Sequence, residues 1–317
     1  MRDAYDLIVI GGGPAGITGA LTAVECGVED VLIIERGDRL GGILNQCTHS
    51  GFGMAYCGEE MTGTEFAGRL RERIKGSKVE AMTGSMVLGI SEDRTVIVSN
   101  ESGCARLHAR AVILATGCRE RPLSSLQVTG TRPSGVFEAG AAQKMLNLGG
   151  YDIGDDIVVL GSGDVGLVVA RCLAQRGRRV IGVFEIRDIC GGSDKNRTEC
   201  LDFYGIPLYF RHTVTRIHGD GRISGVTMKD LDSGEERFIP CKTLITSLGL
   251  VPERELVEPL EYENGSLPEW LFTCGDARTV HDTVDAVAFE AEETGAAAAE
   301  FLREALTNER FRSEERL

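Results

Sequence analysis

Residues 6–16 read DLIVIGGGPAG, an apolar run that leads into three glycines and then into a helical pattern. Leu7 to Ile10 predict a buried strand, the glycines a tight turn, and the residues from Pro14 onward a helix. Such a turn can hold a pyrophosphate, because backbone N–H groups and the positive end of the helix dipole point at one place. Glu35 ends the next apolar run, where a carboxylate would accept hydrogen bonds from a ribose. This stretch therefore predicts a dinucleotide site.

The same pattern returns at residues 156–166, which read DIVVLGSGDVG. The two copies keep one offset of 150 residues without a gap, and the matched pairs are Gly11 and Gly161, Gly13 and Gly163, Gly16 and Gly166, Ala20 and Ala170, Gly27 and Gly177, and Glu35 and Glu185. A repeat over a whole strand–turn–helix unit predicts a repeated site, and not chance similarity. We therefore predict two dinucleotide sites in one chain.

The composition excludes several classes of protein. The chain has 317 residues, enough for two domains, and its 34 Lys and Arg against 48 Asp and Glu give a net charge of −14. Such an acidic chain is a poor partner for nucleic acid or for an anionic membrane. No apolar run approaches the roughly 20 residues that span a bilayer, and the first strand starts too early to leave room for a signal peptide. We expect a cytoplasmic protein.

Ten cysteines are scattered along the chain, and none forms a C-x-x-C pair. This spacing predicts neither a zinc or other metal site nor a thioredoxin-type dithiol. Most of the cysteines have apolar neighbours, which indicates small core residues in a reducing compartment.

Hydrophobic periodicity predicts an α/β fold with further elements in both halves. Helices are expected at 62–75, 137–148, 194–204 and 284–305. Buried strands are expected at 110–117, 242–249 and 270–276, and shorter, antiparallel strands at 79–83, 86–91, 94–99, 104–108, 207–210, 213–218, 222–230 and 236–240. Residues 118–135 are interpreted as a connector between domains.

Three motifs together resemble one family: the first glycine-rich turn with Glu35, the strand end Ala115-Thr116-Gly117, and Gly275-Asp276 before the last helix. With the second turn between them, the whole chain resembles the two-dinucleotide-binding-domain flavoproteins, the thioredoxin-reductase-like group. The resemblance implies two Rossmann-like three-layer ββα domains. The FAD-binding domain would comprise residues 1–118 and 247–317, and the NAD(P)-binding domain, inserted into it, residues 119–246.

The resemblance also implies which residues bind the cofactors. For FAD these are Gly11, Gly13, Pro14, Ala15 and Gly16 at the pyrophosphate, Glu35 with Arg36 at the ribose, Gly42, Ile43, Leu44 and Asn45 along the flavin, and Val87, Thr116, Gly117, Gly275, Asp276, Thr283 and Val284. Val284 would offer its N–H to the flavin N1/O2 edge, where a helix N-terminus stabilises the charge of reduced flavin. The alternative for Asp282-Thr283 is an ordinary helix cap.

For the second dinucleotide the implied residues are Gly161, Gly163, Asp164, Val165, Gly166, Glu185 and Gly249. Glu185 favours NADH over NADPH, because a carboxylate accepts from the 2′-hydroxyl of NAD and repels the 2′-phosphate of NADP. Arg187 is a single nearby cation, whereas readers of NADP usually place several basic residues here.

The chain departs from thioredoxin reductase at the place of that enzyme's C-x-x-C, because residues 132–143 contain no cysteine. The loop 42–53 also lacks the paired cysteines of glutathione-reductase-type enzymes. Residues 135–143 and this loop are more similar to flavoprotein subunits that accompany anaerobic glycerol-3-phosphate dehydrogenases, and to hydrogen cyanide synthase and opine oxidase subunits. That resemblance implies a partner subunit that exchanges electrons with this chain, with membrane contact only through partners. Whether the chain forms a homo-oligomer is left open.

Three side chains keep two interpretations each. Cys47, in the loop expected beside the flavin, is a candidate redox thiol or a small residue that shapes the pocket. His49 is a candidate proton donor or an ordinary polar loop residue, and His281 would either contact the flavin or only precede the last helix. Two alternatives to an NADH-dependent flavin oxidoreductase also remain: a flavin-holding scaffold without NADH turnover, and a thiol/disulfide reductase that uses Cys47.

Overall fold

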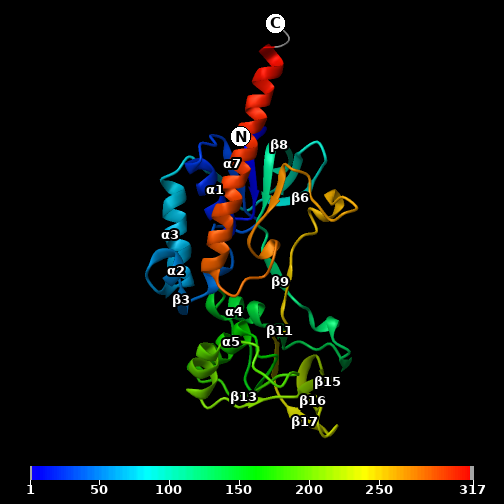
Figure 1. Cartoon of the computed structure of the whole chain (residues 1–317). Coiled ribbons are helices and arrows are strands. Elements are labelled where there is room, and N and C mark those ends of the chain that lie inside the picture. Colours follow the sequence, from blue (N-terminus) through cyan, green and yellow to red (C-terminus); the bar gives the residue numbers. More distant parts are fainter. Residues whose placement is uncertain (1, 315–317) are drawn as a thin grey trace. The chain divides into compact units, whose positions relative to one another are not determined.

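The computed structural model describes residues 2–314, so Met1 and residues 315–317, which the predicted FAD-binding domain includes, lie outside it. The chain folds as two compact units (Figure 1). The first contains the residues up to Arg119 and from Pro252 onward, and the second contains Glu120–Val251. The predicted crossings, after residues 118 and 246, lie one and five residues before these boundaries. The cofactor assigned to each unit stays a prediction.

The first unit is built on a seven-stranded sheet in the order β5-β2-β1-β8-β7-β6, with β20 paired to β8 on the parallel side. Its elements are β1 (Ala4–Ile10), α1 (Pro14–Glu25), β2 (Val31–Ile34), η1 (Gly42–Gln46), β3 (Ser50–Phe52), α2 (Met54–Cys57), β4 (Met61–Thr62), α3 (Gly63–Lys75), β5 (Glu80–Met82), β6 (Met86–Ile90), β7 (Thr95–Asn100), β8 (Gly103–Leu114), η4 (Glu258–Leu260), β20 (Leu271–Thr273), η5 (Gly275–Ala277) and α7 (Val284–Glu314).

Strand β8 joins the two kinds of pairing in this sheet. Its first half pairs antiparallel with β7, and from His108 to Leu114 it pairs parallel with β1. The prediction of two separate strands, 104–108 and 110–117, was therefore wrong, because one strand exchanges partners without a turn. The strand predicted at 79–83 is also not part of the antiparallel layer, since β5 extends the parallel sheet beside β2.

Alternation along the strands sends successive side chains into two cores. Leu7, Val9 and Ile33 pack with α1, α3 and α7, which lie side by side on one face (Figure 1). Ile8 and Ile10 pack on the other face with β6, β7 and the segment 256–271. This three-layer arrangement is the predicted one. Helix α7 runs nine residues beyond its predicted end, since no Gly or Pro follows residue 305 to stop it.

The second unit repeats this plan with a parallel sheet, β11-β18-β12-β13-β14, and a second sheet, β10-β15-β16-β17, in which β15, β16 and β17 pair antiparallel and β10 pairs parallel with β15. Its elements are η2 (Leu123–Ser125), β10 (Thr129–Gly130), β11 (Val136–Glu138), α4 (Ala139–Asn147), β12 (Ile157–Leu160), α5 (Asp164–Gln175), β13 (Val180–Phe184), α6 (Asp194–Arg197), η3 (Thr198–Asp202), β14 (Leu208–Tyr209), β15 (His212–Asp220), β16 (Arg222–Asp230), β17 (Glu236–Pro240) and β18 (Thr243–Thr246). At the boundary, β9 (Cys118–Glu120) pairs with β19 (Leu250–Pro252).

The helix predicted at 137–148 starts later than expected. Val136 and Phe137 belong to strand β11, which pairs with β18, and α4 begins only at Ala139. A β-branched and an aromatic residue favour the strand here, and a parallel neighbour is present to receive it. The residues predicted as a plain connector likewise include β10, which pairs with β15.

Candidate functional site

Four adjacent parallel strands of the first unit end at one edge of the sheet. The order β2-β1-β8-β20 places the loops after these strands next to one another. They carry Glu35, the turn 11–16, the pair Thr116-Gly117 and the pair Gly275-Asp276. Ligands of open α/β sheets bind at the carboxyl ends of the strands. The three motifs, which are far apart in the sequence, therefore meet at the edge where such a site is expected.

The first turn is shaped by close backbone contacts. Gly11 has a φ of 107°, and a Cβ there would collide with the carbonyl oxygen of Ala115. A Cβ at Gly16 would collide with the carbonyl oxygen of Gly11. These two glycines allow α1 and β8 to approach the turn, so packing alone accounts for them.

Gly13 needs a different explanation. Its φ of −75° and ψ of −176° suit any residue. A Cβ there would have only the Cα of Gly42, at 4.0 Å, within 4 Å. Neither backbone strain nor packing therefore requires glycine, and the space in front of it is what a side chain would fill. The residues present fit a pyrophosphate that approaches the backbone closely at this point.

The helices that follow the two repeated turns lack side-chain caps. In the described part of the chain, neither Gly13 before α1 nor Gly163 before α5 provides a capping hydrogen bond. Helix α3, by contrast, begins with a complete capping box between Thr62 and Glu65. N–H groups that no side chain satisfies, together with the helix dipole, favour an anion at both turns.

Glu35 is held in place by the chain itself. Its Oε2 accepts from Gly12 N at 2.7 Å and its Oε1 from Gly37 N at 2.6 Å. The carboxylate therefore lies against the turn, with lone pairs left to accept from a ribose. Arg36, predicted beside it, is exposed and pairs with Glu253 at 3.5 Å. Val87 lies in β6 with its side chain in the second core, so only its backbone is available to a ligand.

The loop after β2 closes one side of the site. Gly42 lies so near the turn that a Cβ there would stand 2.9 Å from the Cα of Gly13. Leu44 and Asn45 are buried, and Arg71 donates to Asn45 Oδ1 at 2.9 Å, whereas Ile43 is 58% exposed. These residues thus adjoin the turn as predicted for residues along a flavin, but their contact with one stays a prediction.

The last motif sits where β20 meets α7. Gly275, with a φ of 61°, packs so closely on Ala15 that a Cβ would come within 2.7 Å of that residue's Cβ. Asp276 follows it, and Cys118 donates from Sγ to Asp276 Oδ2 at 3.6 Å. Thr283 caps α7, since its Oγ1 accepts from Ala286 N at 3.3 Å. This is the ordinary helix cap, and Val284 is the first residue of the helix that it caps.

Cys47 is a buried thiol, 7% exposed, and donates to Ile43 O at 3.4 Å. Burial raises its pKa to about 12. The thiolate is the reactive form of cysteine, and this burial disfavours it at pH 8. The environment therefore favours the pocket-shaping interpretation over a redox role.

We expect Cys47 in the native protein to resist alkylation, because almost no thiolate forms. The protein is treated with iodoacetamide at pH 8, and modified cysteines are identified by mass spectrometry. Cys104, which is exposed, is the internal control and should be modified first. Modification of Cys47 at the rate of Cys104 would revive the redox interpretation.

The second turn reproduces the first in its backbone contacts. Gly161 has a φ of 94°, and its N donates to Phe184 O at 2.7 Å, as Gly11 N donates to Ile34 O at 2.8 Å. Helix α5 covers residues 164–175, an offset of 150 from the 14–25 of α1. The repeat predicted from the sequence is thus a repeat of backbone geometry.

Glu185 is more buried than its counterpart, at 4% exposed. Its Oε2 accepts from Ser162 N at 2.9 Å and from Ser162 Oγ at 2.5 Å, and its Oε1 lies 3.2 Å from Arg187 Nε. Burial alone would raise its pKa, but the hydrogen bonds from Ser162 and Arg187 outweigh burial and hold the pKa below the usual value. The carboxylate is therefore ionised at neutral pH.

The remaining predicted residues of this unit lie at the same edge. Asp164 is exposed, and its Oδ1 accepts from Ser193 N at 2.9 Å and from Asn196 Nδ2 at 2.7 Å, which connects its carboxylate to the N-terminus of α6. Val165 is packed against the core. A Cβ added at Gly166 would come too close to the side chain of Ser247. A Cβ added at Gly249, which has a φ of 98°, would have no described atom within 4 Å.

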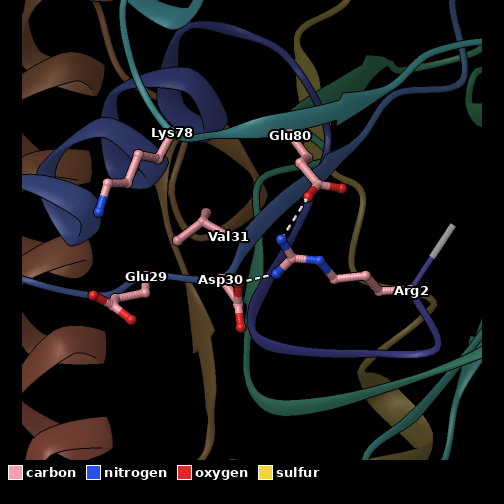
Figure 2. A pocket seen from close by; sticks show the side chains of 6 residues that line it. All are labelled: Arg2, Glu29, Asp30, Val31, Lys78 and Glu80. Carbon is pink, nitrogen blue, oxygen red and sulfur yellow. Dashed lines mark hydrogen bonds and ion pairs between the residues drawn. The ribbon is translucent and has the colours of Figure 1, made fainter.

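A hollow of about 410 Å³ at the other end of the first sheet is not part of this site (Figure 2). It lies at the amino ends of β2 and β5, where Arg2 reaches between Asp30 and Glu80 (Figure 2). Lys78 and Glu29 complete a rim of exposed charges. Ion pairs on an open surface do not make a built site, and parallel strands bind ligands at their opposite ends.

Two further observations concern metal ions and membranes. In residues 2–314, no cluster of His, Cys, Asp and Glu side chains is suited to hold a metal ion. No helix in the same range is both long and apolar enough to span a membrane.

Several contacts at the site were missed from the sequence. Ser162 could have been found from the 150-residue offset, which places it opposite Gly12. The contacts of His281 with Asp276, and of Glu290 with Arg278 and His281, join residues up to 12 positions apart across a turn and the start of α7, and no periodic pattern indicates them.

Comparison with known proteins gives a match over most of the chain. Residues 5–268 match the family model described as pyridine nucleotide-disulphide oxidoreductase. An alkyl hydroperoxide reductase subunit of Staphylococcus aureus is 26% identical over 252 residues, which cover 79% of this chain and 47% of that protein. The chain thus spans about half the length of the curated relatives it matches.

Solved structures share the fold. Thioredoxin reductase from T. acidophilum superposes with a TM-score of 0.75 at 20% identity, covering 96% of this chain and all of that one. Bacillithiol disulfide reductase from Bacillus cereus gives 0.74 at 19% identity, covering 94% and 98%. These likenesses confirm the predicted fold class of two Rossmann-like domains. With the family match, they establish that the chain belongs to the pyridine nucleotide-disulphide oxidoreductase family, which implies FAD and NAD(P) as its cofactors.

Proposed function

We propose that this chain is an FAD-dependent oxidoreductase that accepts hydride from NADH and passes electrons to a partner. FAD would lie at the edge formed by Gly13, Glu35 and Asp276, and NADH at the edge formed by Gly163 and Glu185. When both are bound, the cofactors supply the hydride chemistry, and the protein supplies orientation and electrostatics. The observation that carries the proposal is the duplicated turn, with uncapped helices after both copies.

The residues of each edge have distinct tasks. The N–H groups of α1 and α5 would bind pyrophosphates, and the carboxylates of Glu35 and Glu185 would accept from riboses. Val284 N, at the start of α7, would face the flavin edge where negative charge develops on reduction. None of these tasks needs a titrating acid or base, so the reaction depends on positioning.

NADH is preferred over NADPH in this proposal because Glu185 is ionised and fixed at the position that meets the 2′-substituent. Arg187, the nearby cation, is occupied by Glu185 at 3.2 Å. A 2′-phosphate would therefore meet an arginine, Arg187, that is already paired with Glu185.

The electron acceptor is proposed to be a protein partner. The similarity of residues 135–143 and 42–53 to subunits of glycerol-3-phosphate-dehydrogenase-like complexes favours a dehydrogenase or electron-carrier partner. A relative that is itself named as a subunit supports a partner of some kind. Disulfide reduction is a weaker candidate, since residues 132–143 contain no cysteine and burial disfavours the thiolate of Cys47. The ten free cysteines of the chain suit a reducing compartment, and we therefore propose that the protein is cytoplasmic.

Anaerobic mixing with NADH should bleach the visible flavin absorbance of the FAD-loaded protein in a stopped-flow instrument. NADPH at the same concentration should bleach it at least about tenfold more slowly, given a carboxylate at the 2′ position. Bleaching by neither nucleotide would leave the scaffold alternative, in which the chain holds FAD for a partner and never oxidises NADH. Co-purification followed by mass spectrometry would then identify the partner in either case.

A further inference from the structure

His281 lies between two carboxylates beside the predicted flavin edge. Its Nδ1 lies 3.2 Å from Asp276 Oδ1, and its Nε2 lies 2.8 Å from Glu290 Oε2. The other oxygen of Glu290, Oε1, lies 3.1 Å from Arg278 Nη1. We call Asp276, Arg278, His281 and Glu290 the Asp276 cluster. It joins the turn after β20 to the second turn of α7, all within the first unit.

Asp276 is held in one orientation by this arrangement. Its Oδ1 accepts from the backbone N of His281 at 2.9 Å as well as facing the His281 ring, while its Oδ2 receives Cys118 Sγ at 3.6 Å. Among residues 2–314, the backbone N–H and the ring of His281 face Oδ1, and the weak thiol donor of Cys118 faces Oδ2. Oδ2 is therefore the oxygen with capacity left for a ligand, and His281 determines which way it points.

Glu290 lies against the other nitrogen of the His281 ring. The side chain of Glu290 is 17% exposed and that of His281 is 19% exposed, so their contact is largely shielded from water. Glu290 also belongs to α7, whose packing on α1 fixes its position. The ring therefore contacts helix α7 at one nitrogen and the turn after β20 at the other.

We infer that His281 is a positioning residue for FAD: anchored by Glu290, it aims the Asp276 carboxylate at the cofactor. This inference rests on the proposed function, in which Asp276 faces FAD. It differs from both earlier interpretations of His281, since the side chain neither contacts the flavin nor merely precedes α7. The alternative is that the Asp276 cluster only stabilises the conformation of the loop 278–283 and does not affect the orientation of the Asp276 carboxylate.

A double-mutant cycle separates these two roles. His281→Ala, Asp276→Asn and the double variant are stripped of FAD and titrated with FAD, and dissociation constants are read from the quenching of flavin fluorescence. We expect each single variant to weaken binding about tenfold or more, as for a lost hydrogen bond to a charged group. In the Asp276→Asn background, removal of His281 should cost less than about threefold, because no carboxylate remains to be aimed. If the fold losses of FAD affinity in the two single variants multiply in the double variant, the inference is overturned.

Two conservative variants test which nitrogen matters. Asn carries a donor at the place of Nδ1 and nothing at the place of Nε2, so His281→Asn should recover part of the affinity lost in His281→Ala. Gln carries its donor further out, toward Glu290, so His281→Gln should remain as weak as His281→Ala. Equal affinity of the Asn and Gln variants would contradict a role through Asp276. This comparison also decides the matter if His281→Ala does not fold.

Glu290→Gln has a matched control on the same helix. Glu293 is exposed, and its side chain makes no hydrogen bond or ion pair with residues 2–314. Glu290→Gln should weaken FAD binding about threefold or more, and Glu293→Gln should leave it unchanged. If neither changes it, Glu290 is not the anchor and the inference fails.

If Asp276→Asn binds FAD as the unmodified chain does, the placement of FAD in the proposed function fails, and the inference with it. If Asp276→Asn weakens binding but His281→Ala does not, only the inference fails.

Discussion

Gly13→Val should abolish FAD binding and leave the apoprotein folded. A valine fits the backbone at this position, because φ is −75° and only the Cα of Gly42, at 4.0 Å, lies within 4 Å of an added Cβ. The side chain would instead occupy the space in which the pyrophosphate approaches the N–H groups of α1. A loss of at least about 2.7 kcal/mol, or a hundredfold in Kd, is expected, which is at the upper end for overpacking.

The measurement is a titration of apoprotein with FAD by flavin fluorescence, with thermal unfolding of the apoprotein as the test of folding. Gly163→Val is the matched control, since position 163 is the same position of the second copy. A Cβ there meets Ser247 Oγ at 3.0 Å, a flexible atom that can rotate away. This variant should bind FAD normally and lose reduction by NADH. FAD binding by Gly13→Val within threefold of the unmodified chain would refute the assignment of the first turn to FAD.

The contrast between Gly13 and Gly16 shows how far a glycine motif can be interpreted from sequence. Both are part of one pattern, yet a Cβ at Gly16 would collide with the carbonyl oxygen of Gly11, whereas a Cβ at Gly13 would collide with none of residues 2–314. The sequence predicted that a pyrophosphate turn exists, because spacing and the flanking strand and helix indicate it. Only the positions of neighbouring atoms separate the glycine that serves packing from the glycine that leaves room for a ligand.

Local patterns predicted the parallel strands and the repeat well, and they failed where a segment's partner decides its structure. β8 remains one strand through His108 because β7 and β1 accept successive parts of it. Phe137 joins a strand because β18 lies beside it. Neither partner is near in the sequence, so no periodicity in the segment itself carries the information.

The residues of the candidate site likewise include some that local patterns predict and some that they do not. Glu35, Glu185 and Asp276 could be identified because each follows an apolar strand at a fixed place. What holds them could not: Ser162 and Arg187 on Glu185, and His281 on Asp276, are side-chain contacts made across loops. Sequence therefore predicted the groups that face a ligand, and the structure adds the groups that orient them.

Glu185→Gln should reduce the preference for NADH over NADPH by at least about tenfold. The carboxylate is ionised and nine-tenths buried, and at an effective dielectric constant near 20 two unit charges 4 Å apart repel by about 4 kcal/mol. Solvent and relaxation reduce this figure, but about 1.4 kcal/mol suffices for tenfold. The amide oxygen still accepts from Ser162 N and Oγ, and the amide NH2 can donate to the oxygen of the 2′-hydroxyl, so kcat/KM for NADH should fall by less than about tenfold.

The gain for NADPH has a second cause that can be tested separately. With Glu185 neutral, Arg187 loses its ion pair and becomes available to a 2′-phosphate. Arg187→Ala should therefore remove most of the NADPH gain in the Glu185→Gln background, while in the unmodified chain it should change little. Stopped-flow flavin reduction by each nucleotide gives the four rates of this cycle.

Glu35→Gln is the matched control for both changes, since it is the same substitution at the same position of the first copy. It should weaken FAD binding and leave the ratio of NADH to NADPH rates unaltered, because the first turn is proposed to hold the flavin nucleotide. A change of that ratio in Glu35→Gln, together with no change in Glu185→Gln, would exchange the two cofactors between the units. Because the two repeated turns have the same backbone geometry, the comparison of Glu35→Gln with Glu185→Gln decides which turn binds FAD and which binds NADH.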